Sequence, residues 1–143
     1  MSRAFQVTID SSDPRALGGF WAEVLGYVED APPPGFATWT EALTAWGLPP
    51  ERQNDAYAVV DPDGAGPRVF LQKVPEGKTA KNRLHLDVRL SGVPGPAEGK
   101  GEQLQAEADR LVALGATVVR ETLTEVDHYL VMQDPEGNEF CLT

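Results

Sequence analysis

The chain contains one cysteine, Cys141, and two histidines among its 143 residues. A single thiol cannot form an internal disulfide, and few positions remain that could give a metal centre nitrogen or sulfur ligands. No run of about 20 apolar residues occurs, so no membrane-spanning helix is expected. The residues after Met1 show neither the charged start nor the long apolar run of a secretory signal. These absences predict a soluble protein of the cytoplasm.

Basic residues are also scarce, because 12 Lys and Arg stand against 22 Asp and Glu, for a formal net charge of −10. Such an acidic chain repels the phosphates of nucleic acids and of anionic membranes, so neither is an expected partner. The sequence lacks the GxGxxG, P-loop, HExxH, GxSxG and CxxC patterns, which excludes the dinucleotide, nucleotide, zincin and serine-hydrolase interpretations. A small molecule is the partner that remains.

One order of elements occurs twice in the chain. Tyr57–Val60 is followed by the turn Asp61-Pro-Asp-Gly64, and Tyr129–Gln133 is followed by the turn Asp134-Pro-Glu-Gly137. Proline and glycine supply the fixed and the positive φ angles of a turn, so both aspartates are assigned to turns and not to catalysis. A strand and an amphipathic helix precede each copy. The predicted order is therefore strand, helix and three strands, twice, within one domain.

The first copy begins with an alternating strand at residues 4–9. A helix follows, with Asp13 as its N-cap, Pro14 in its first turn and Gly26 as its end. Its apolar stripe has helical spacing and consists of Leu17, Phe20, Trp21, Val24 and Leu25. The middle strand comes either from Tyr27–Asp30 or from the aromatic, proline-rich segment up to residue 55, where a helical turn is expected at 41–45. The other strands are predicted at 57–60 and 68–74.

The second copy begins with a predicted strand at Arg83–Leu90, in which leucine and valine alternate with His85, Asp87 and Arg89. A helix is predicted over residues 102–114, ending at Gly115. Its predicted buried face consists of Leu104, Ala108, Leu111 and Val112. The remaining strands are predicted at 117–121, 129–133 and 139–143.

Four segments carry a family resemblance: Phe5–Ile9, Phe20–Gly26, Asn82–Val88 and Asp134–Leu142. With them the chain resembles the glyoxalase, bleomycin-resistance and extradiol-dioxygenase superfamily, also called the vicinal oxygen chelate superfamily. The resemblance implies an α+β fold within a single domain, 1–143. In it, two βαβββ modules, at about 4–75 and about 83–143, form a cup-shaped mixed sheet with helices on its outer face. It also implies a ligand in the cup between the modules.

In metal-using members, the resemblance implies one ligand on the first strand and one on the last strand of each module. The matching positions here are Gln6, Gln72, His85 and Cys141. Members with enzymatic activity typically carry glutamate at the last-strand positions, where this chain has Gln72 and Cys141. Hard ions prefer anionic oxygens, whereas zinc or nickel accepts an imidazole and a thiolate. A divalent metal is thus a candidate cofactor, but the donor set favours a site without one, and Cys141 favours a buried structural role.

His85 is the candidate catalytic base, and Asp87 lies two residues further along the same strand face, about 7 Å away along the backbone. The alternative for His85 is a half-buried histidine bonded to a neighbouring strand. Gln6 and Gln72 are either ligand-orienting amides or polar fillers. Trp39 and Trp46 either cover a planar ligand or pack their own segment down. His128 is expected at the rim of the cup, in a structural role.

These observations predict a glyoxalase-like small-molecule-binding protein. If it is an enzyme, the resemblance implies a lyase or isomerase acting next to a carbonyl, with a degenerate metal site. The alternative is a non-enzymatic, ligand-sequestering protein like the bleomycin-resistance proteins, for which the resemblance implies a homodimer. A third alternative is a partner-binding module whose cavity is filled by side chains.

Overall fold

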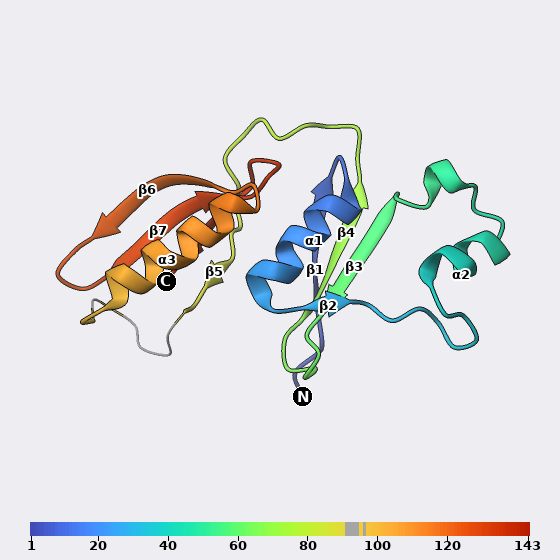
Figure 1. The fold of residues 1–143 in the computed structure, drawn as a ribbon, viewed down its shortest axis with the longest axis horizontal. Helices are drawn as coiled ribbons and strands as arrows, with labels where there is room; N and C mark the ends of the chain where they lie inside the picture. Colours follow the sequence, from blue (N-terminus) through green and yellow to red (C-terminus); the bar gives the residue numbers. More distant parts are fainter. Residues whose placement is uncertain (91–94, 96) are drawn as a thin grey trace. The chain divides into compact units, whose positions relative to one another are not determined.

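The computed structural model describes residues 1–90, 95 and 97–143. The chain divides into two compact units, Met1–Gly77 (unit 1) and Lys78–Thr143 (unit 2), which are described separately below. Figure 1 shows that each unit contains one sheet and a long helix. None of the helices in the described residues combines the length and the apolar character that crossing a membrane requires.

Unit 1 holds a four-stranded mixed sheet in the order β1-β4-β3-β2. Its elements are β1 (Gln6–Ser11), α1 (Pro14–Leu25), β2 (Val28–Glu29), α2 (Trp39–Ala45), the 3-10 helix η1 (Pro50–Arg52), β3 (Ala56–Val60) and β4 (Arg68–Lys73). Strands β1 and β4 are parallel, and the other two pairs are antiparallel. A parallel pair needs a crossover connection, which here runs through α1 and the two antiparallel strands.

Helix α1 forms where the sequence predicts it, because both of its ends carry a stop signal. The Asp13 carboxylate accepts a hydrogen bond from the Ala16 amide at 3.2 Å, and Gly26 has a φ of 68°. The apolar face packs on β3 and β4. The buried side chains of that face are Leu17, Phe20, Trp21 and Val24. They cover Val59, Val69 and Leu71, which form the core side of the sheet.

The strand that follows α1 in the chain is β2, at the edge of the sheet, so the first predicted alternative, a strand within Tyr27–Asp30, is confirmed. The aromatic segment folds as α2, which contains the predicted helical turn. Thr38 accepts a hydrogen bond from the Glu41 amide at 3.1 Å, while Glu41 accepts one from the Ala37 amide at 2.9 Å. These reciprocal side-chain bonds resemble a capping box and explain why a seven-residue helix forms here.

Unit 2 repeats the strand order of unit 1, as β5-β8-β7-β6. Its elements are β5 (Asp87–Val88), α3 (Lys100–Ala113), β6 (Thr117–Leu123), β7 (His128–Gln133) and β8 (Glu139–Leu142). Strands β5 and β8 are parallel, and α3 packs on β6 and β7. The α+β class and the two βαβββ modules predicted from the repeat are confirmed.

Two details of unit 2 differ from the prediction. The first strand is only β5, and Leu84 is 74% exposed, because backbone hydrogen bonds to the last strand begin at Leu86. Val112 is 46% exposed, because the buried stripe of α3 follows the spacing of Leu104, Ala108 and Leu111, one position away. Gly115, at a φ of 108°, ends the helix as predicted.

The two aspartate turns are confirmed as turns. Asp61 accepts hydrogen bonds from the amides of Asp63 and Gly66 at 2.9 and 2.8 Å, which lowers the pKa of its carboxyl group. Asp134 accepts from the amides of Glu136 and Asn138 at 2.9 and 3.0 Å. Both carboxylates are therefore used to hold backbone in place.

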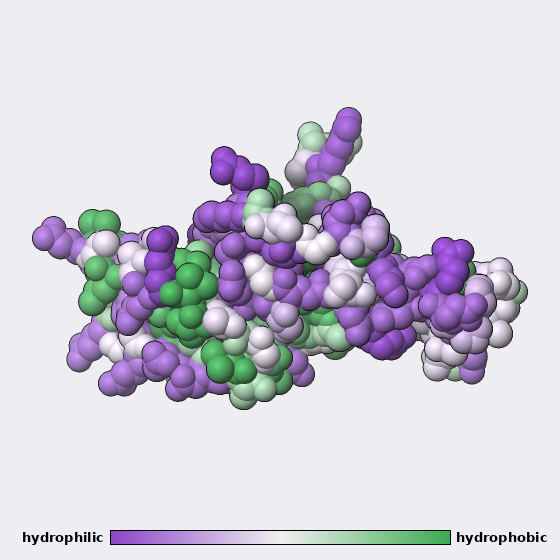
Figure 2. All heavy atoms as spheres, turned by 90° about the horizontal axis from the view of Figure 1, so that it is seen from above, coloured by the Kyte–Doolittle hydropathy of each residue, from purple (hydrophilic) through white to green (hydrophobic). Residues whose placement is uncertain are grey.

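Hydrophilic residues cover most of the face seen in Figure 2, as the charge balance predicts, with hydrophobic groups between them. In unit 2 the exposed hydrophobic residues include four from β6 and the turn after it, namely Val118, Val119, Leu123 and Val126.

Candidate functional site

The candidate site lies on the face of the unit 2 sheet that α3 does not cover. On β8, Phe140 and Leu142 are buried on the helix side, so Cys141 points the other way. The register places Asp87 of β5 directly beside Cys141. A pocket of about 300 Å³ opens on this face. Its polar lining residues are Lys81, His85, Asp87, Arg120, Asp127, Tyr129, Glu139, Cys141 and Thr143.

His85 and Asp87 form a hydrogen-bonded pair in this pocket. The distance from His85 Nδ1 to Asp87 Oδ1 is 2.8 Å, and the two side chains are 43% and 52% exposed. An ionised carboxylate can only accept, so Nδ1 carries the shared proton, and in the neutral imidazole Nε2 then keeps its lone pair. The pairing follows from the sequence, because side chains two residues apart on an extended chain lie on the same side of it. Ligands can therefore reach a histidine whose free nitrogen is Nε2.

Cys141 stands next to this pair and is kept protonated. Burial raises the pKa of its thiol to about 11, and the charge of Asp87 and a hydrogen bond to it act in the same direction. At neutral pH the group is a neutral thiol and not a thiolate nucleophile. Cys141 is half-buried and lines the pocket, so both its structural role and its place among the ligand-binding residues stay predictions.

Two cationic side chains in the pocket were not predicted as site residues. Arg120 comes from β6 and Lys81 from the segment before β5, and both positive charges are close enough to Cys141 to act on its pKa. Within the described residues, no carboxylate forms an ion pair with either of them. Glu139, which also lines the pocket, is already paired with Lys78 at 3.1 Å. The lining also includes the carboxylates of Asp87 and Asp127, so an anionic ligand would have to bind at these two cations in a pocket that carries both signs of charge.

Gln6 and Gln72 belong to unit 1 and lie on neighbouring strands, with both side chains on the sheet face opposite α1, as the alternation predicts. They do not bond each other. Gln6 Oε1 accepts from Arg68 at 3.0 Å, and the Gln72 amide donates to Asp10 at 2.9 Å. The register explains why the two glutamines do not meet. Gln6 is opposite Arg68 and Gln72 is opposite Asp10, and these two pairs are four residues apart along the strands.

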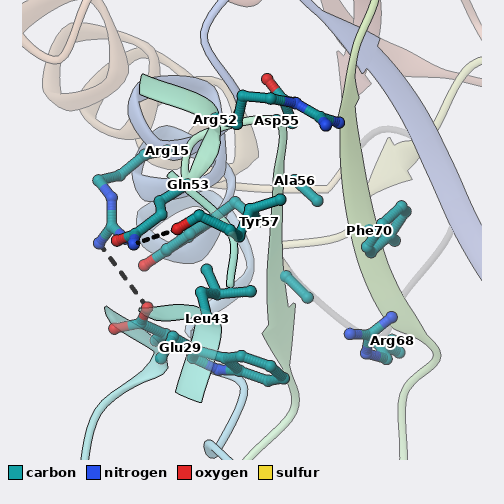
Figure 3. A pocket seen from close by; sticks show the side chains of 13 residues that line it. Arg15, Glu29, Leu43, Arg52, Gln53, Asp55, Ala56, Tyr57, Arg68 and Phe70 are labelled. Atoms are coloured by element: carbon teal, nitrogen blue, oxygen red, sulfur yellow. Dashed lines mark hydrogen bonds and ion pairs between the residues drawn. The ribbon is translucent and has the colours of Figure 1, made fainter. Parts of the chain in front are cut away.

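The aromatic side chains of the α2 segment pack on one another. The ring centroids of Trp39 and Trp46 are 6.4 Å apart, those of Phe36 and Trp46 are 6.1 Å apart, and both contacts are edge-to-face. Trp46 is 60% exposed, whereas the Trp39 indole donates to the Asp30 carbonyl at 2.7 Å. Trp39 also lines a second pocket, which lies within unit 1. Figure 3 shows this pocket with other lining residues labelled.

The expectation for His128 needs correction, because it is buried and does not lie at a rim. Along β7 it alternates in phase with Leu130 and Met132, which places its ring on the helix side of the sheet. There His128 Nε2 lies 2.7 Å from Glu121 Oε1, and the Gly101 backbone approaches the ring closely. The alternation along β7 determines the side of the sheet on which His128 lies. The residue types of the two histidines in the sequence did not indicate that side.

The model of the glyoxalase-like domain family matches residues 6–143. The chain belongs to this glyoxalase-like family. No curated protein shows significant similarity to it.

Solved structures share the fold at low sequence identity. A glyoxalase/bleomycin resistance protein/dioxygenase family enzyme from Burkholderia phytofirmans PsJN has a TM-score of 0.62 and 16% identity, covering 96% of this chain and 94% of its own. A mutant of the fosfomycin resistance protein FosX from Listeria monocytogenes, in complex with Mn(II) and 1S,2S-dihydroxypropylphosphonic acid, has a TM-score of 0.62 and 12% identity, covering 99% and 89%. A glyoxalase/dioxygenase from Nostoc punctiforme has a TM-score of 0.58 and 20% identity, covering 98% and 88%. Identities this low show the fold alone.

A metal in this glyoxalase-like chain would need ligands that the donor set supplies poorly. Ligand atoms of His85, Asp87 and Cys141 all lie within 4.8 Å of one another, and their atom types match zinc. However, His85 Nδ1 and Asp87 Oδ1 share a proton at 2.8 Å, and the Cys141 thiol is held protonated. Hard ions would find one carboxylate among these three donors. Zinc binding at these three donors would require the thiol to lose its proton, and the chemistry below uses side chains alone.

Proposed function

We propose that the chain is an enzyme, a lyase or isomerase that removes a proton next to the carbonyl of a small carboxylate, with His85 as the base. The observation that carries the proposal is the 2.8 Å bond between His85 Nδ1 and Asp87 Oδ1 in a pocket that also holds Lys81 and Arg120, neither of which pairs with a carboxylate of the described residues. The bond fixes the ring orientation and leaves Nε2 available to a ligand.

In the proposed step, the C–H bond next to the carbonyl breaks and its proton moves to His85 Nε2. The electron pair moves into the new C=C bond, and the carbonyl oxygen becomes an enolate oxygen. Asp87 stabilises the imidazolium that forms, since its carboxylate faces Nδ1. An isomerase returns the proton to the same carbon with altered configuration, and the carbonyl re-forms. In a lyase the carbonyl re-forms, a C=C bond forms between the α and β carbons, and a leaving group departs from the β carbon with its bonding electron pair.

Arg120 and Lys81 hold the carboxylate of the substrate and the developing enolate in this scheme. Both lie in the pocket with His85 and neither has a carboxylate partner among the described residues. A preorganised positive charge favours the anionic intermediate more than the neutral carbonyl, which is the condition for lowering a barrier. Cys141 supports Asp87 as a neutral hydrogen-bond donor and forms no covalent bond to the substrate.

The second candidate function is ligand binding without turnover. It is favoured by the residues at the two last-strand positions, where Gln72 is bonded to Asp10 and Cys141 is a neutral thiol. A site of this kind would bind an anion through Arg120 and Lys81 while His85 only donates or accepts a hydrogen bond.

Proton exchange in D₂O separates these candidates. Short 2-oxo acids such as 2-oxobutanoate carry both the carboxylate and the acidic C–H, and loss of their α-proton signal is followed by ¹H NMR. Wild-type protein should accelerate exchange, and His85→Ala should lower the rate about 100-fold or more, as expected for loss of a positioned base.

The matched arginine variants test the anion site. Arg120→Ala should weaken saturation by the 2-oxo acid, whereas Arg89→Ala, which removes an exposed arginine that does not line the pocket, should leave it unchanged. Saturable binding at the His85 imidazole without exchange would support the sequestering function. Neither binding nor exchange by any 2-oxo acid would reject the proposed enzyme.

A further inference from the structure

Unit 1 contains a separate pocket of about 130 Å³ between the α2 segment and the sheet. Its apolar walls come from α2, the segment after it, β3 and β4, and consist of Trp39, Leu43, Leu48, Tyr57, Ala58 and Phe70. In Figure 3, Arg15 and Glu29 lie on one side of this pocket, with Arg68 and Phe70 on the other. None of these residues takes part in the chemistry assigned to unit 2.

The charged groups around the pocket are already used within the protein. Arg15 pairs with Glu29 at 3.8 Å, Arg52 with Asp55 at 2.9 Å, and Arg68 with Asp30 at 2.8 Å. Because each cation and each of these carboxylates has a partner, a charged ligand would have to compete for it. The pocket is therefore suited to an uncharged group.

The polar tips of the wall residues are also satisfied or neutral. The Trp39 indole donates to a backbone carbonyl, and the Gln53 amide donates to Thr44 Oγ1 at 3.0 Å and to the Leu48 carbonyl at 3.1 Å. Burial raises the pKa of Tyr57, so its phenol stays neutral. The Arg15 guanidinium lies 5.1 Å from the centre of the Tyr57 ring and helps to hold it in place.

Volume and shape narrow the class of ligand. An apolar cavity of about 150 Å³ in another protein accommodates benzene, so a pocket of this size has room for about one six-membered ring. Walls built from Trp39, Tyr57 and Phe70 can meet such a ring edge-to-face or offset, which adds to the gain from burial.

We propose that this pocket binds an uncharged monocyclic aromatic ring, either as a small compound or as the ring end of a larger one. The site goes beyond the proposed function, since it uses residues of Met1–Gly77 only.

Benzyl alcohol is the probe, and benzoate, benzylamine and cyclohexylmethanol are its charged and non-aromatic counterparts. Binding is followed from the methyl signals of Leu43 and Leu48 by ¹H–¹³C NMR. Benzyl alcohol should give saturable shifts at both residues. Benzoate and benzylamine should bind at least about tenfold more weakly than benzyl alcohol, because each would bury a charge without a partner.

Three variants locate and size the site. Ala58→Leu fills the pocket and should weaken benzyl alcohol binding about tenfold or more, whereas Ala45→Leu, on an exposed position of α2 outside the lining, should not change it. Leu43→Ala enlarges the pocket and should favour 2-naphthalenemethanol over benzyl alcohol relative to wild type. This change of preference decides the matter even if Ala58→Leu does not fold.

The absence of saturable shifts with benzyl alcohol would overturn the proposal, as would equally strong binding of benzoate. Unchanged binding in both Ala58→Leu and Leu43→Ala would place the ring elsewhere and also overturn it. His85→Ala should bind benzyl alcohol like the wild type, so the result does not depend on the proposed enzymatic activity.

Discussion

The reactivity of Cys141 gives a sharp test of the environment assigned to the unit 2 site. Burial and Asp87 raise the pKa of its thiol from an ordinary 9.0 to about 11. At pH 7.5 this shift lowers the thiolate fraction about 100-fold relative to a cysteine of ordinary pKa. A more basic thiolate is intrinsically the better nucleophile, which recovers roughly sixfold to tenfold of the rate. Alkylation by iodoacetamide should therefore be about 10 to 15 times slower than for an ordinary thiol.

The assay is unambiguous because the chain has one cysteine. The alkylation rate is measured from pH 7 to 11.5 by mass spectrometry of the intact protein. Half-burial of Cys141 slows the reaction by the same factor at every pH, so the shape of the profile reports the pKa alone. The rate should keep rising through pH 10.

The variant Asp87→Asn isolates the electrostatic part of the shift. It removes the negative charge, which should move the midpoint of the profile toward the ordinary value without reaching it, because burial is the larger cause. A wild-type midpoint at pH 9 or below would refute the placement of Cys141 beside a carboxylate in a partly desolvated pocket.

Two further predictions concern stability and are measured by urea unfolding. Gly18→Ala should destabilise the protein by about 1–3 kcal/mol, because the added methyl group would lie 2.2 Å from Tyr57 Cδ1. Gly19→Ala in the same helix should stabilise the protein by about 0.5–1 kcal/mol, because its methyl group would meet open space. A similar effect of both changes would contradict the packing of α1 on β3. A backbone hydrogen bond from Asn82 and the pairing with Lys78 lower the pKa of the Glu139 carboxyl group to about 2. Glu139→Gln should therefore reduce the free energy of unfolding at pH 7 by about 1–2 kcal/mol, after allowance for solvent screening. A depressed pKa contributes stability above the unfolded value of 4.5 that is lost as the pH falls through about 2, so wild type and variant should converge in acid. A constant difference down to pH 2 would contradict the assignment.

The elements that the sequence predicted well are those with signals at both ends. Helix α1 has Asp13 and Gly26, and the two aspartate turns carry proline and glycine, so local chemistry was sufficient to define them. The extent of β5 was not predictable in this way. A strand ends where its partner's hydrogen bonds end, and those are set by the neighbouring β8.

The same limit applies to the candidate site. The pair His85 and Asp87 could be found from alternation alone, because residues two positions apart on an extended segment share a side, even though only Asp87 lies in β5. Arg120 could not, since its presence in the pocket depends on how β6 aligns with β7. His85 is exposed in the pocket, whereas His128 is buried on the helix side of the sheet. The difference could not be predicted, because burial depends on which face of the sheet a helix covers.

The central claim is that Asp87 holds His85 with its proton on Nδ1, so that Nε2 is free to act on a ligand. Long-range ¹H–¹⁵N NMR of the two imidazoles distinguishes the tautomers, and His85→Ala assigns the signals. We expect neutral His85 in the Nδ1–H form in the wild type, and a shift toward the Nε2–H form in Asp87→Asn. An Nε2–H tautomer in the wild type, or a tautomer that Asp87→Asn leaves unchanged, would contradict the account.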